Sequence, residues 1–238
     1  MEKKDSLWPG GPVFYFSDDA MKPSTDSFLL ADFARVRPGD AVVDLGAGSG
    51  LLGVLLLARQ PALRIVGVEC SEEACTLARR NFAENDMAAE ILPGDLREIE
   101  RLLSRSAADA VICNPPYFAQ ETGAVASGER GTARTELHAT LDDICAAADK
   151  ALKYGGRFFL IYRTERLADL LEKCRRHHLE PKRMRLVQHR RGKAPELVLL
   201  ECKKGGHPGL QTEVPLWIEN EDGTETEDVK RAYFRDKE

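Results

Sequence analysis

A short polar and aromatic string, Asn114-Pro115-Pro116-Tyr117, has the residue types needed to hold a planar amino group. An asparagine side-chain oxygen and a proline carbonyl can together accept both hydrogens of an NH2 group. The prolines cannot continue a hydrogen-bonded ladder, so the strand predicted before them must end there. An aromatic ring can stack on a planar base or amide. We therefore predict that these four residues are catalytic; the alternative is a plain turn.

A second motif, DLGAGSG at residues 44–50, combines a carboxylate with three closely spaced glycines. Glycines after a strand let the backbone turn tightly and approach a nucleotide-type ligand. Compared with the dinucleotide pattern G-x-G-x-x-G, the third glycine comes one residue early, at Gly50. Asp44 would repel a pyrophosphate but can bind an ammonium, and S-adenosylmethionine carries an ammonium and no phosphate. The loop therefore favours S-adenosylmethionine, with a structural turn as the alternative.

Two further carboxylates follow predicted strands. Glu69 ends RIVGVE, where Rossmann-type folds place an acid that accepts hydrogen bonds from ribose hydroxyls. Asp95 follows the next strand and can accept a hydrogen bond from the adenine amino group of a cofactor, with the Leu96 backbone near the ring. Alternatively, Asp95 is the N-cap of the helix that follows. Asn114 is also expected to border the cofactor.

Short apolar runs alternate with amphipathic segments, and these elements must position the motifs. Strands are expected at 41–46, 64–69, 88–95, 108–117, 157–163, 182–190 and 196–204. Helices are expected at 27–36, 50–60, 71–85, 96–105, 141–156 and 165–179. The alternation predicts an α/β, Rossmann-like fold with a mostly parallel seven-stranded sheet and a C-terminal antiparallel hairpin.

The composition, 43% hydrophobic and 31% charged, is that of an ordinary soluble globular protein. No apolar run approaches the ~18 residues of a membrane span, and the first residues lack a signal-peptide pattern, so we expect a cytoplasmic protein. The six cysteines form no C-x-x-C pair, which predicts reduced thiols and no metal. We expect an irregular leader at 1–23, one domain at 24–204, and an acidic, partly frayed tail at 205–238.

Charge is distributed unevenly along the chain. The net charge is −5, yet residues 163–204 contain thirteen Lys and Arg against six Asp and Glu. A basic segment on an acidic protein can contact phosphates, or it can be a solvated helix face and hairpin.

DLGAGSG combined with NPPY resembles the class I methyltransferases that modify planar amino nitrogens. Within that group, roughly residues 14–204 most resemble the bacterial tRNA1(Val) (adenine-37-N6)-methyltransferase family. MKPSTDSFLLADF resembles the family's K-x-G-T-D-x-x-L-L-x-x-F helix, with Ser24 where glycine is usual. RGTARTE resembles its A-R-x-E element, and the segment from LKYGG to GHPGL resembles the back half of Firmicutes-type members, with a variant RGKAP turn.

The resemblance implies methyl transfer from S-adenosylmethionine to N6 of an adenine in RNA, with tRNA adenosine 37 as the expected target. The methionine end of the cofactor is then surrounded by Asp44, Gly46, Gly48 and Gly50. Its carboxylate is covered by Lys22 and Thr25. Phosphates of the RNA are contacted by Arg130, Arg134, Lys182, Arg183, Arg185, Arg190, Arg191 and Lys193. A monomer or weak homodimer is expected.

Two alternatives remain open at this point. In a protein-glutamine N5-methyltransferase, NPPY would bind a carboxamide, but such enzymes carry a sizeable helical domain and only about forty residues precede the first strand here. The other alternative is a non-catalytic cofactor- or RNA-binding protein, which the intact motifs disfavour. We assign no general base, because in-line positioning and two carbonyl acceptors on the amino group suffice for the chemistry.

Overall fold

The structure is a computed structural model that describes residues 2–17, 23–115 and 139–235. The helices are α1 (Thr25–Phe33), α2 (Leu51–Arg59), α3 (Glu72–Glu84), η1 (Leu96–Glu98), α4 (Ile99–Leu102), α6 (Leu141–Ala151), η3 (Thr164–Arg166), α7 (Leu167–Arg176) and α8 (Glu227–Ala232). The strands are β1 (Glu2–Ser6), β2 (Val13–Ser17), β3 (Ala41–Leu45), β4 (Arg64–Glu69), β5 (Ala89–Pro93), β6 (Ala108–Cys113), β7 (Leu152–Arg163), β8 (Leu179–Arg190), β9 (Leu197–Lys204), β10 (Gln211–Thr212) and β11 (Leu216–Glu219).

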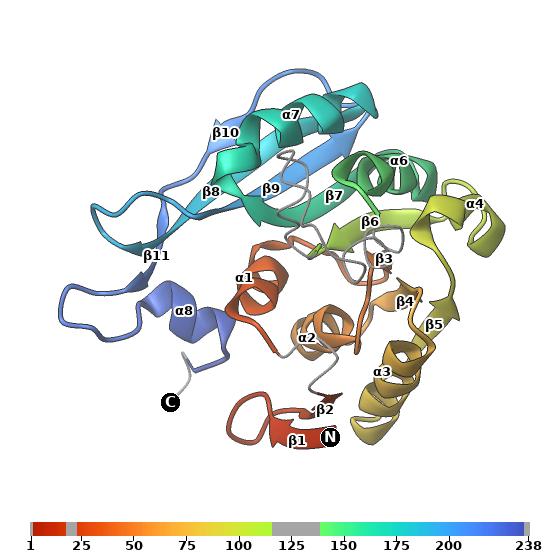
Figure 1. The fold of residues 1–238 in the computed structure, drawn as a ribbon, viewed down its shortest axis with the longest axis horizontal. Helices are drawn as coiled ribbons and strands as arrows, with labels where there is room; N and C mark the ends of the chain where they lie inside the picture. Colours follow the sequence, from red (N-terminus) through yellow and green to blue (C-terminus); the bar gives the residue numbers. More distant parts are fainter. Residues whose placement is uncertain (1, 18–22, 116–138, 236–238) are drawn as a thin grey trace, which may run out of the picture.

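The main sheet has the order β10-β8-β9-β7-β6-β3-β4-β5, with β11 also pairing with β8 (Figure 1). From β7 to β5 all neighbours are parallel, whereas β9 is antiparallel to both β7 and β8. The chain order reverses at β3, which lies between β4 and β6. Open α/β sheets bind ligands at such a reversal, outside the carboxyl ends of the strands.

Local sequence explains why these elements begin and end where they do. The β3 segment AVVDL has four consecutive buried residues, as expected for a strand covered on both faces. The Ser71 side chain accepts a hydrogen bond from the Ala74 amide and caps α3. Thr140 and Asp143 form a capping box at the start of α6. These caps fix the residues at which the helices begin. The loops that lead from the strands into the helices therefore lie at one edge of the sheet.

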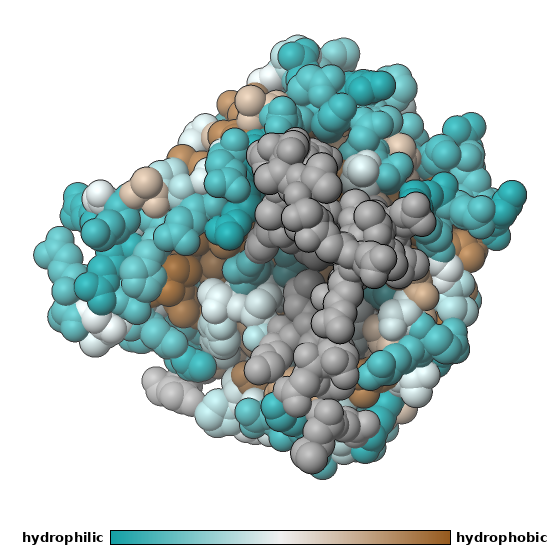
Figure 2. Space-filling view, in the orientation of Figure 1, coloured by the Kyte–Doolittle hydropathy of each residue, from teal (hydrophilic) through white to brown (hydrophobic). Residues whose placement is uncertain are grey.

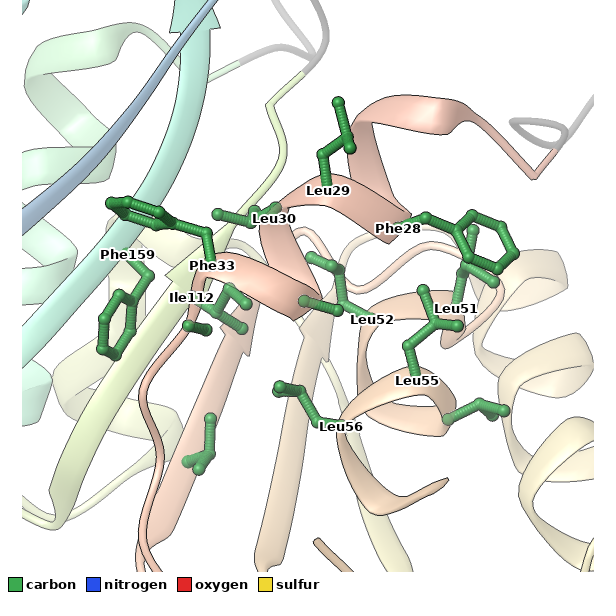
Figure 3. Close-up of a cluster of buried hydrophobic side chains, with 14 of the residues drawn as sticks. Phe28, Leu29, Leu30, Phe33, Leu51, Leu52, Leu55, Leu56, Ile112 and Phe159 are labelled. Atoms are coloured by element: carbon green, nitrogen blue, oxygen red, sulfur yellow. The ribbon is translucent and has the colours of Figure 1, made fainter. Parts of the chain in front are cut away.

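Two apolar clusters cover the two faces of the sheet. One contains leucines and phenylalanines of α1 and α2 together with Ile112 of β6 and Phe159 of β7 (Figure 3). The other contains residues of α6 and α7, including Ile144 and Leu170. Each buried Leu, Ile or Phe side chain contributes about 1.5–3 kcal/mol, so the two clusters hold the sheet rigidly behind its carboxyl edge.

The face shown in Figure 2 is mostly hydrophilic, with small and scattered apolar areas. Among the described residues, no helix is both long and apolar enough to cross a membrane.

The expected fold class is confirmed, and the seven expected strands are β3 to β9. Four expected helices had wrong boundaries by more than one residue. The helix expected at 27–36 runs from Thr25 to Phe33, and the helix expected at 165–179 ends at Arg176, because Leu179 already belongs to β8. The helix expected at 141–156 ends at Ala151, because β7 already begins at Leu152 and contains Gly155 with a φ of 79°. The helix expected at 96–105 is a 3-10 turn followed by α4, which ends at Leu102.

The expected irregular leader is also corrected. Residues 2–6 and 13–17 form an antiparallel hairpin, β1–β2. Two asparagines hold this hairpin: Asn81 of α3 accepts a hydrogen bond from the Tyr15 amide, and Asn85, which directly follows α3, accepts one from the Val13 amide. The side-chain amides of these two asparagines take the place of a neighbouring strand beside β2. Such contacts cannot be predicted from the pattern of apolar residues.

The segment expected to be only partly ordered is ordered as far as residue 235 and adds two strands to the main sheet. β10 and β11 pair in parallel with β8, and α8 packs against α1 (Figure 1). Tyr233 stacks on Phe28 of α1 with ring centroids 4.1 Å apart, and Phe234 stacks on Trp8 at 3.9 Å. These aromatic contacts hold the segment in place.

Candidate active site

The loop after β3 turns on three glycines with positive φ. Gly46, Gly48 and Gly50 have φ values of 74°, 54° and 85°, which L side chains rarely adopt. A Cβ at Gly46 or Gly48 would meet nothing within 4 Å, so both leave the backbone open to a ligand. A Cβ at Gly50 would lie 2.9 Å from Phe82, so this glycine instead allows α2 to pack closely against α3.

Asn81 supports the glycine loop from behind, and the sequence analysis missed it. Its Nδ2 donates to the carbonyls of Ser49 and Tyr15, both at 2.9 Å, and its side chain is fully buried. The available signal was a polar residue between Ala78 and Phe82 on the apolar face of α3. Asn81 thus connects the loop to the β1–β2 hairpin.

Asp44, at the end of β3, is a buried carboxylate with an unmet hydrogen-bonding need. It is 2% exposed, and among the described residues its Oδ1 atom has no hydrogen-bond partner. Burial, with a smaller contribution from the nearby Glu69 carboxylate, raises the pKa of Asp44 to about 8. A buried unpaired carboxylate is costly unless a cation or donor reaches it. A bound ammonium group would satisfy Oδ1 and remove this cost.

Glu69 connects the ends of β3 and β4. Its Oε2 accepts a hydrogen bond from the Gly48 amide at 2.9 Å, and its Oε1 accepts one from the Ser71 amide at 2.8 Å. The carboxylate is therefore held by backbone donors from both neighbouring loops. The Cys70 thiol also donates to Oε1, at 3.4 Å, so Oε2 can accept a further hydrogen bond and a ribose hydroxyl at Oε1 would take the place of the thiol.

Asp95 caps η1, as in the alternative considered from the sequence. Its Oδ1 accepts from the Arg97 amide at 2.8 Å, and its carboxylate forms an ion pair with the Arg97 guanidinium. The arginine lowers the pKa of Asp95, so the group is ionised, and the Arg97 side chain donates to both of its carboxylate oxygens. The structure supports the capping role; contact of Asp95 and Leu96 with adenine stays a prediction.

Asn114 directly follows β6, and the prediction that the prolines end this strand agrees with its last residue, Cys113. Ile112 pairs with Asp44 of β3, and this register places Asn114 beside the glycine loop. The Asn114 Nδ2 atom donates to the Ser27 hydroxyl of α1 at 2.9 Å. Within the described part of the chain, the Asn114 Oδ1 atom has no hydrogen-bond partner, so an acceptor is available at the cofactor edge.

Comparisons with known proteins agree with this geometry. Residues 15–180 match the family model of the methyltransferase small domain. The tRNA1(Val) (adenine(37)-N6)-methyltransferase of Porphyromonas gingivalis is 30% identical over 77% of this chain and 75% of the relative. The enzyme of the same name from Erwinia tasmaniensis is 33% identical, over 68% of this chain and 67% of the relative. The chain belongs to the tRNA1(Val) (adenine(37)-N6)-methyltransferase family.

A solved structure supports the fold of this methyltransferase. A crystal structure described as a predicted O-methyltransferase from Agrobacterium tumefaciens superimposes with a TM-score of 0.72. The two chains are 23% identical, and the match covers 89% of this chain and 96% of the other. At that sequence identity the structural similarity supports the fold alone, and it confirms the Rossmann-like fold.

S-adenosylmethionine is the cofactor of this methyltransferase, and the site fits it. The unpaired Asp44 oxygen suits the ammonium, the open backbone at Gly46 and Gly48 gives room for the methionine end, and Glu69 suits the ribose. Thr25 lies at the start of α1, where its hydroxyl shares a 2.9 Å hydrogen bond with the Tyr233 hydroxyl. Five expected site residues lie outside the described residues: Lys22, Pro116, Tyr117, Arg130 and Arg134.

The expected RNA contact of Arg183 was wrong. Its side chain is buried, pairs with Glu201 at 2.8 Å, and donates to the Phe33 carbonyl at 2.6 Å. The guanidinium also lies over the Phe33 ring, 3.6 Å from its centroid. Arg183 therefore connects β8 to α1 and cannot reach a phosphate in this arrangement.

Three other basic residues of the hairpin bind acceptors of the C-terminal segment. Arg185 pairs with Asp228 at 2.6 Å, and Arg190 pairs with Glu219 at 2.5 Å. Lys182 donates to the backbone carbonyls of residues 207 and 209. Two of these three basic side chains are thus paired with carboxylates of the acidic segment that follows, and the third contacts backbone carbonyls. RNA contacts by these three residues stay predictions.

The turn that joins β8 to β9 follows the strand residues that make these contacts. β8 runs parallel to β7, because both are antiparallel to β9, so residues 191–196 lie at the carboxyl edge of the sheet. The Thr164 amide, just after β7, donates to the Glu196 carbonyl at 3.0 Å and fixes the turn there. Arg191 and Lys193 are exposed on this turn. Both expected RNA contacts therefore lie on the edge that carries Asn114.

Proposed function

We propose that this methyltransferase transfers the methyl group of S-adenosylmethionine to N6 of adenosine 37 in a tRNA. The main support for this proposal is the Oδ1 atom of Asn114. This acceptor has no hydrogen-bond partner among the described residues and lies beside the glycine loop that follows Asp44. The relatives in Porphyromonas gingivalis and Erwinia tasmaniensis are named for this reaction. No relative reported above is named for glutamine methylation, and the site has no feature that favours it.

The protein's part in the reaction is to bind, orient and stabilise charge. When bound, the cofactor supplies an electrophilic methyl group on a sulfonium. Asp44 and Glu69 hold its ammonium and ribose, which fixes where the methyl group lies. The Asn114 oxygen and the Pro115 carbonyl accept the two hydrogens of the adenine amino group, which favours a more pyramidal and more nucleophilic nitrogen. Oriented acceptors of this kind also stabilise the positive charge that develops on the nitrogen.

The RNA approaches from the carboxyl edge in this proposal. Arg191 and Lys193 on the β8–β9 turn contact phosphates, with Arg130, Arg134 and Tyr117 of the segment after Asn114 as further contacts. Single-stranded anticodon loops offer unstacked bases that an enzyme can take into a pocket. Lys22 and Thr25 cover the methionine carboxylate, and Asp95 with the Leu96 backbone contacts the adenine of the cofactor.

A substrate of this kind places the protein in the cytoplasm. We further propose that it acts as a monomer or weak homodimer and that residues 24–204 contain the catalytic machinery.

The test compares two tRNA transcripts that differ only at position 37, one with adenosine and one with guanosine. The enzyme is incubated with S-adenosylmethionine labelled in the methyl group, and the RNA is digested to nucleosides. We expect labelled N6-methyladenosine from the first transcript and none from the second. Equal labelling of both transcripts would show that the methylated nucleotide is not at position 37. Label found only in protein would refute the proposal in favour of glutamine methylation.

A further inference from the structure

Ser27 of α1 is the described residue that anchors the side chain of Asn114. The Asn114 Nδ2 atom lies 2.9 Å from the Ser27 hydroxyl oxygen. Ser27 is 5% exposed, although it lies within an apolar stretch in which Phe28, Leu29 and Leu30 are all buried. A buried hydroxyl in the middle of a core helix requires a polar partner, and Asn114 is that partner.

The chemistry of a primary amide gives this contact a consequence for catalysis. An asparagine side chain has a donating NH2 group and an accepting oxygen on opposite sides of one planar carbon. If the amide rotated by half a turn, it would present donors to an amino group that also donates, and binding would fail. A serine hydroxyl could hydrogen-bond either orientation of an amide. In the structure the Ser27 hydroxyl accepts from the Asn114 NH2 group, and this contact holds the orientation in which Oδ1 points away from α1.

The position of α1 is itself well determined, so Ser27 can act as a fixed reference point. The Thr25 hydroxyl bonds the Tyr233 hydroxyl at 2.9 Å, and Phe28 stacks on the Tyr233 ring. At the other end of the helix, Asp32 pairs with Arg231 at 2.9 Å. These contacts come from the C-terminal segment, which lies beyond the matched family region at 15–180.

We propose that Ser27 is a positioning residue that orients the Asn114 amide so that Oδ1 accepts from the target amino group. This assignment rests on the proposed function, because it presumes that Oδ1 meets an NH2 group. Ser27 itself touches neither substrate nor cofactor. Its loss therefore lowers the turnover of bound substrate and leaves both binding steps nearly unchanged.

The kinetic test uses Ser27→Ala, with Ser24→Ala as a matched control. Ser24 is the N-cap residue just before α1, and its hydroxyl lies 3.5 Å from the Ser27 hydroxyl, longer than an ordinary O–H···O hydrogen bond. No described contact joins Ser24 to Asn114. We expect kcat to fall about tenfold in Ser27→Ala, the size expected for one lost orienting hydrogen bond, while Ser24→Ala stays within about twofold. The KM for tRNA and the Kd for S-adenosylmethionine should change less than about twofold in both. A Ser27→Ala enzyme with parental kcat would overturn the assignment.

The double variant Ser27→Ala/Asn114→Ala separates positioning from a general structural effect. If Ser27 acts only through Asn114, removing Ser27 from an enzyme that already lacks Asn114 costs no further activity. If Ser27 merely stabilises the fold around the site, its removal lowers the activity of both backgrounds by the same factor. The second result would contradict the proposal.

A spectroscopic readout is independent of any substrate. In 15N-labelled enzyme, the side-chain amide signals of Asn114 are assigned by their loss in Asn114→Ala. We expect them to shift and to exchange faster with solvent in Ser27→Ala, but not in Ser24→Ala. Unchanged Asn114 signals in Ser27→Ala would refute the contact, whatever the activity. A parent enzyme that methylates no tRNA would instead refute the proposed function, so the two failures can be told apart.

Discussion

Replacing Asp44 by asparagine should stabilise the cofactor-free protein near neutral pH while weakening cofactor binding. Burial raises the pKa of Asp44 from its ordinary value of 3.8 to about 8. Between these two values the folded protein retains a proton that the unfolded chain has released, so the free energy of unfolding falls as pH rises. Each pH unit in this window costs about 1.4 kcal/mol. From pH 5.5 to 7.5, Asp44 alone should remove about 3 kcal/mol.

Asparagine has nearly the same shape and does not titrate, so this loss should be absent in Asp44→Asn. The assay is urea denaturation of cofactor-free protein at pH 5.5 and 7.5. We expect the stability of Asp44→Asn relative to the parent to rise by about 3 kcal/mol between the two pH values. S-adenosylmethionine should then stabilise the parent strongly and the variant weakly, because a neutral amide cannot neutralise the ammonium.

Asp109→Asn is the control for this measurement. The Ala41 amide and the Lys153 ammonium lower the pKa of Asp109, so its contribution is complete above the ordinary carboxyl range. The stability difference between this variant and the parent should therefore be constant from pH 5.5 to 7.5. If Asp44→Asn also shows a constant difference, the buried carboxylate titrates normally and the reasoning about its unpaired oxygen fails.

Three further outcomes test the site. Asn114→Ala should lower kcat by roughly 100-fold or more with little change in cofactor Kd, measured by single-turnover methyl transfer and calorimetry; parental turnover per folded molecule would refute its role. Glu69→Ala should weaken cofactor binding about tenfold or more and leave tRNA affinity unchanged, since it removes the acceptor of the ribose; an unchanged Kd contradicts this. Arg191→Glu/Lys193→Glu should weaken tRNA binding and flatten its salt dependence; a parental salt slope would exclude the turn.

The sheet and the cofactor loop could be predicted because their signals are local. Adjacent residues are enough to predict the strands AVVDLG and RIVGVE and the end of a strand at NPPY. The alternation of strands and helices then predicts the parallel topology. Asp44, Glu69 and Asn114 could be placed at one edge because parallel strands end together. The capping role of Asp95 could also be recognised, because Asp95 directly precedes the helical segment LREIERLL.

The remaining features depend on contacts between residues far apart in the sequence. No residue close to Arg183 in the sequence indicates that Phe33 and Glu201 will enclose its side chain. The number of basic residues in the segment therefore led us to expect an exposed side chain. Ser27 and Asn81 are single polar residues on apolar helix faces, and such residues acquire meaning only when their partners are known. The acidic composition of residues 205–238 suggested fraying, yet acids of this segment pair with arginines of β8 and also with bases of the segment itself, such as Arg235 with Glu225.

The packing of Tyr233 and Phe234 against α1 and Trp8 has a consequence for biosynthesis. A ribosome releases residues 227–235 only after α1, the glycine loop and β6 have all emerged, so a nascent chain can build the sheet before the helix that bears Ser27 is secured. We expect such a chain to bind cofactor while being a poor catalyst, at a moment when it is surrounded by tRNA. Competence to modify RNA would thus be acquired only after residues 227–235 have emerged and packed against α1, and products truncated before that segment would leave tRNA unmodified.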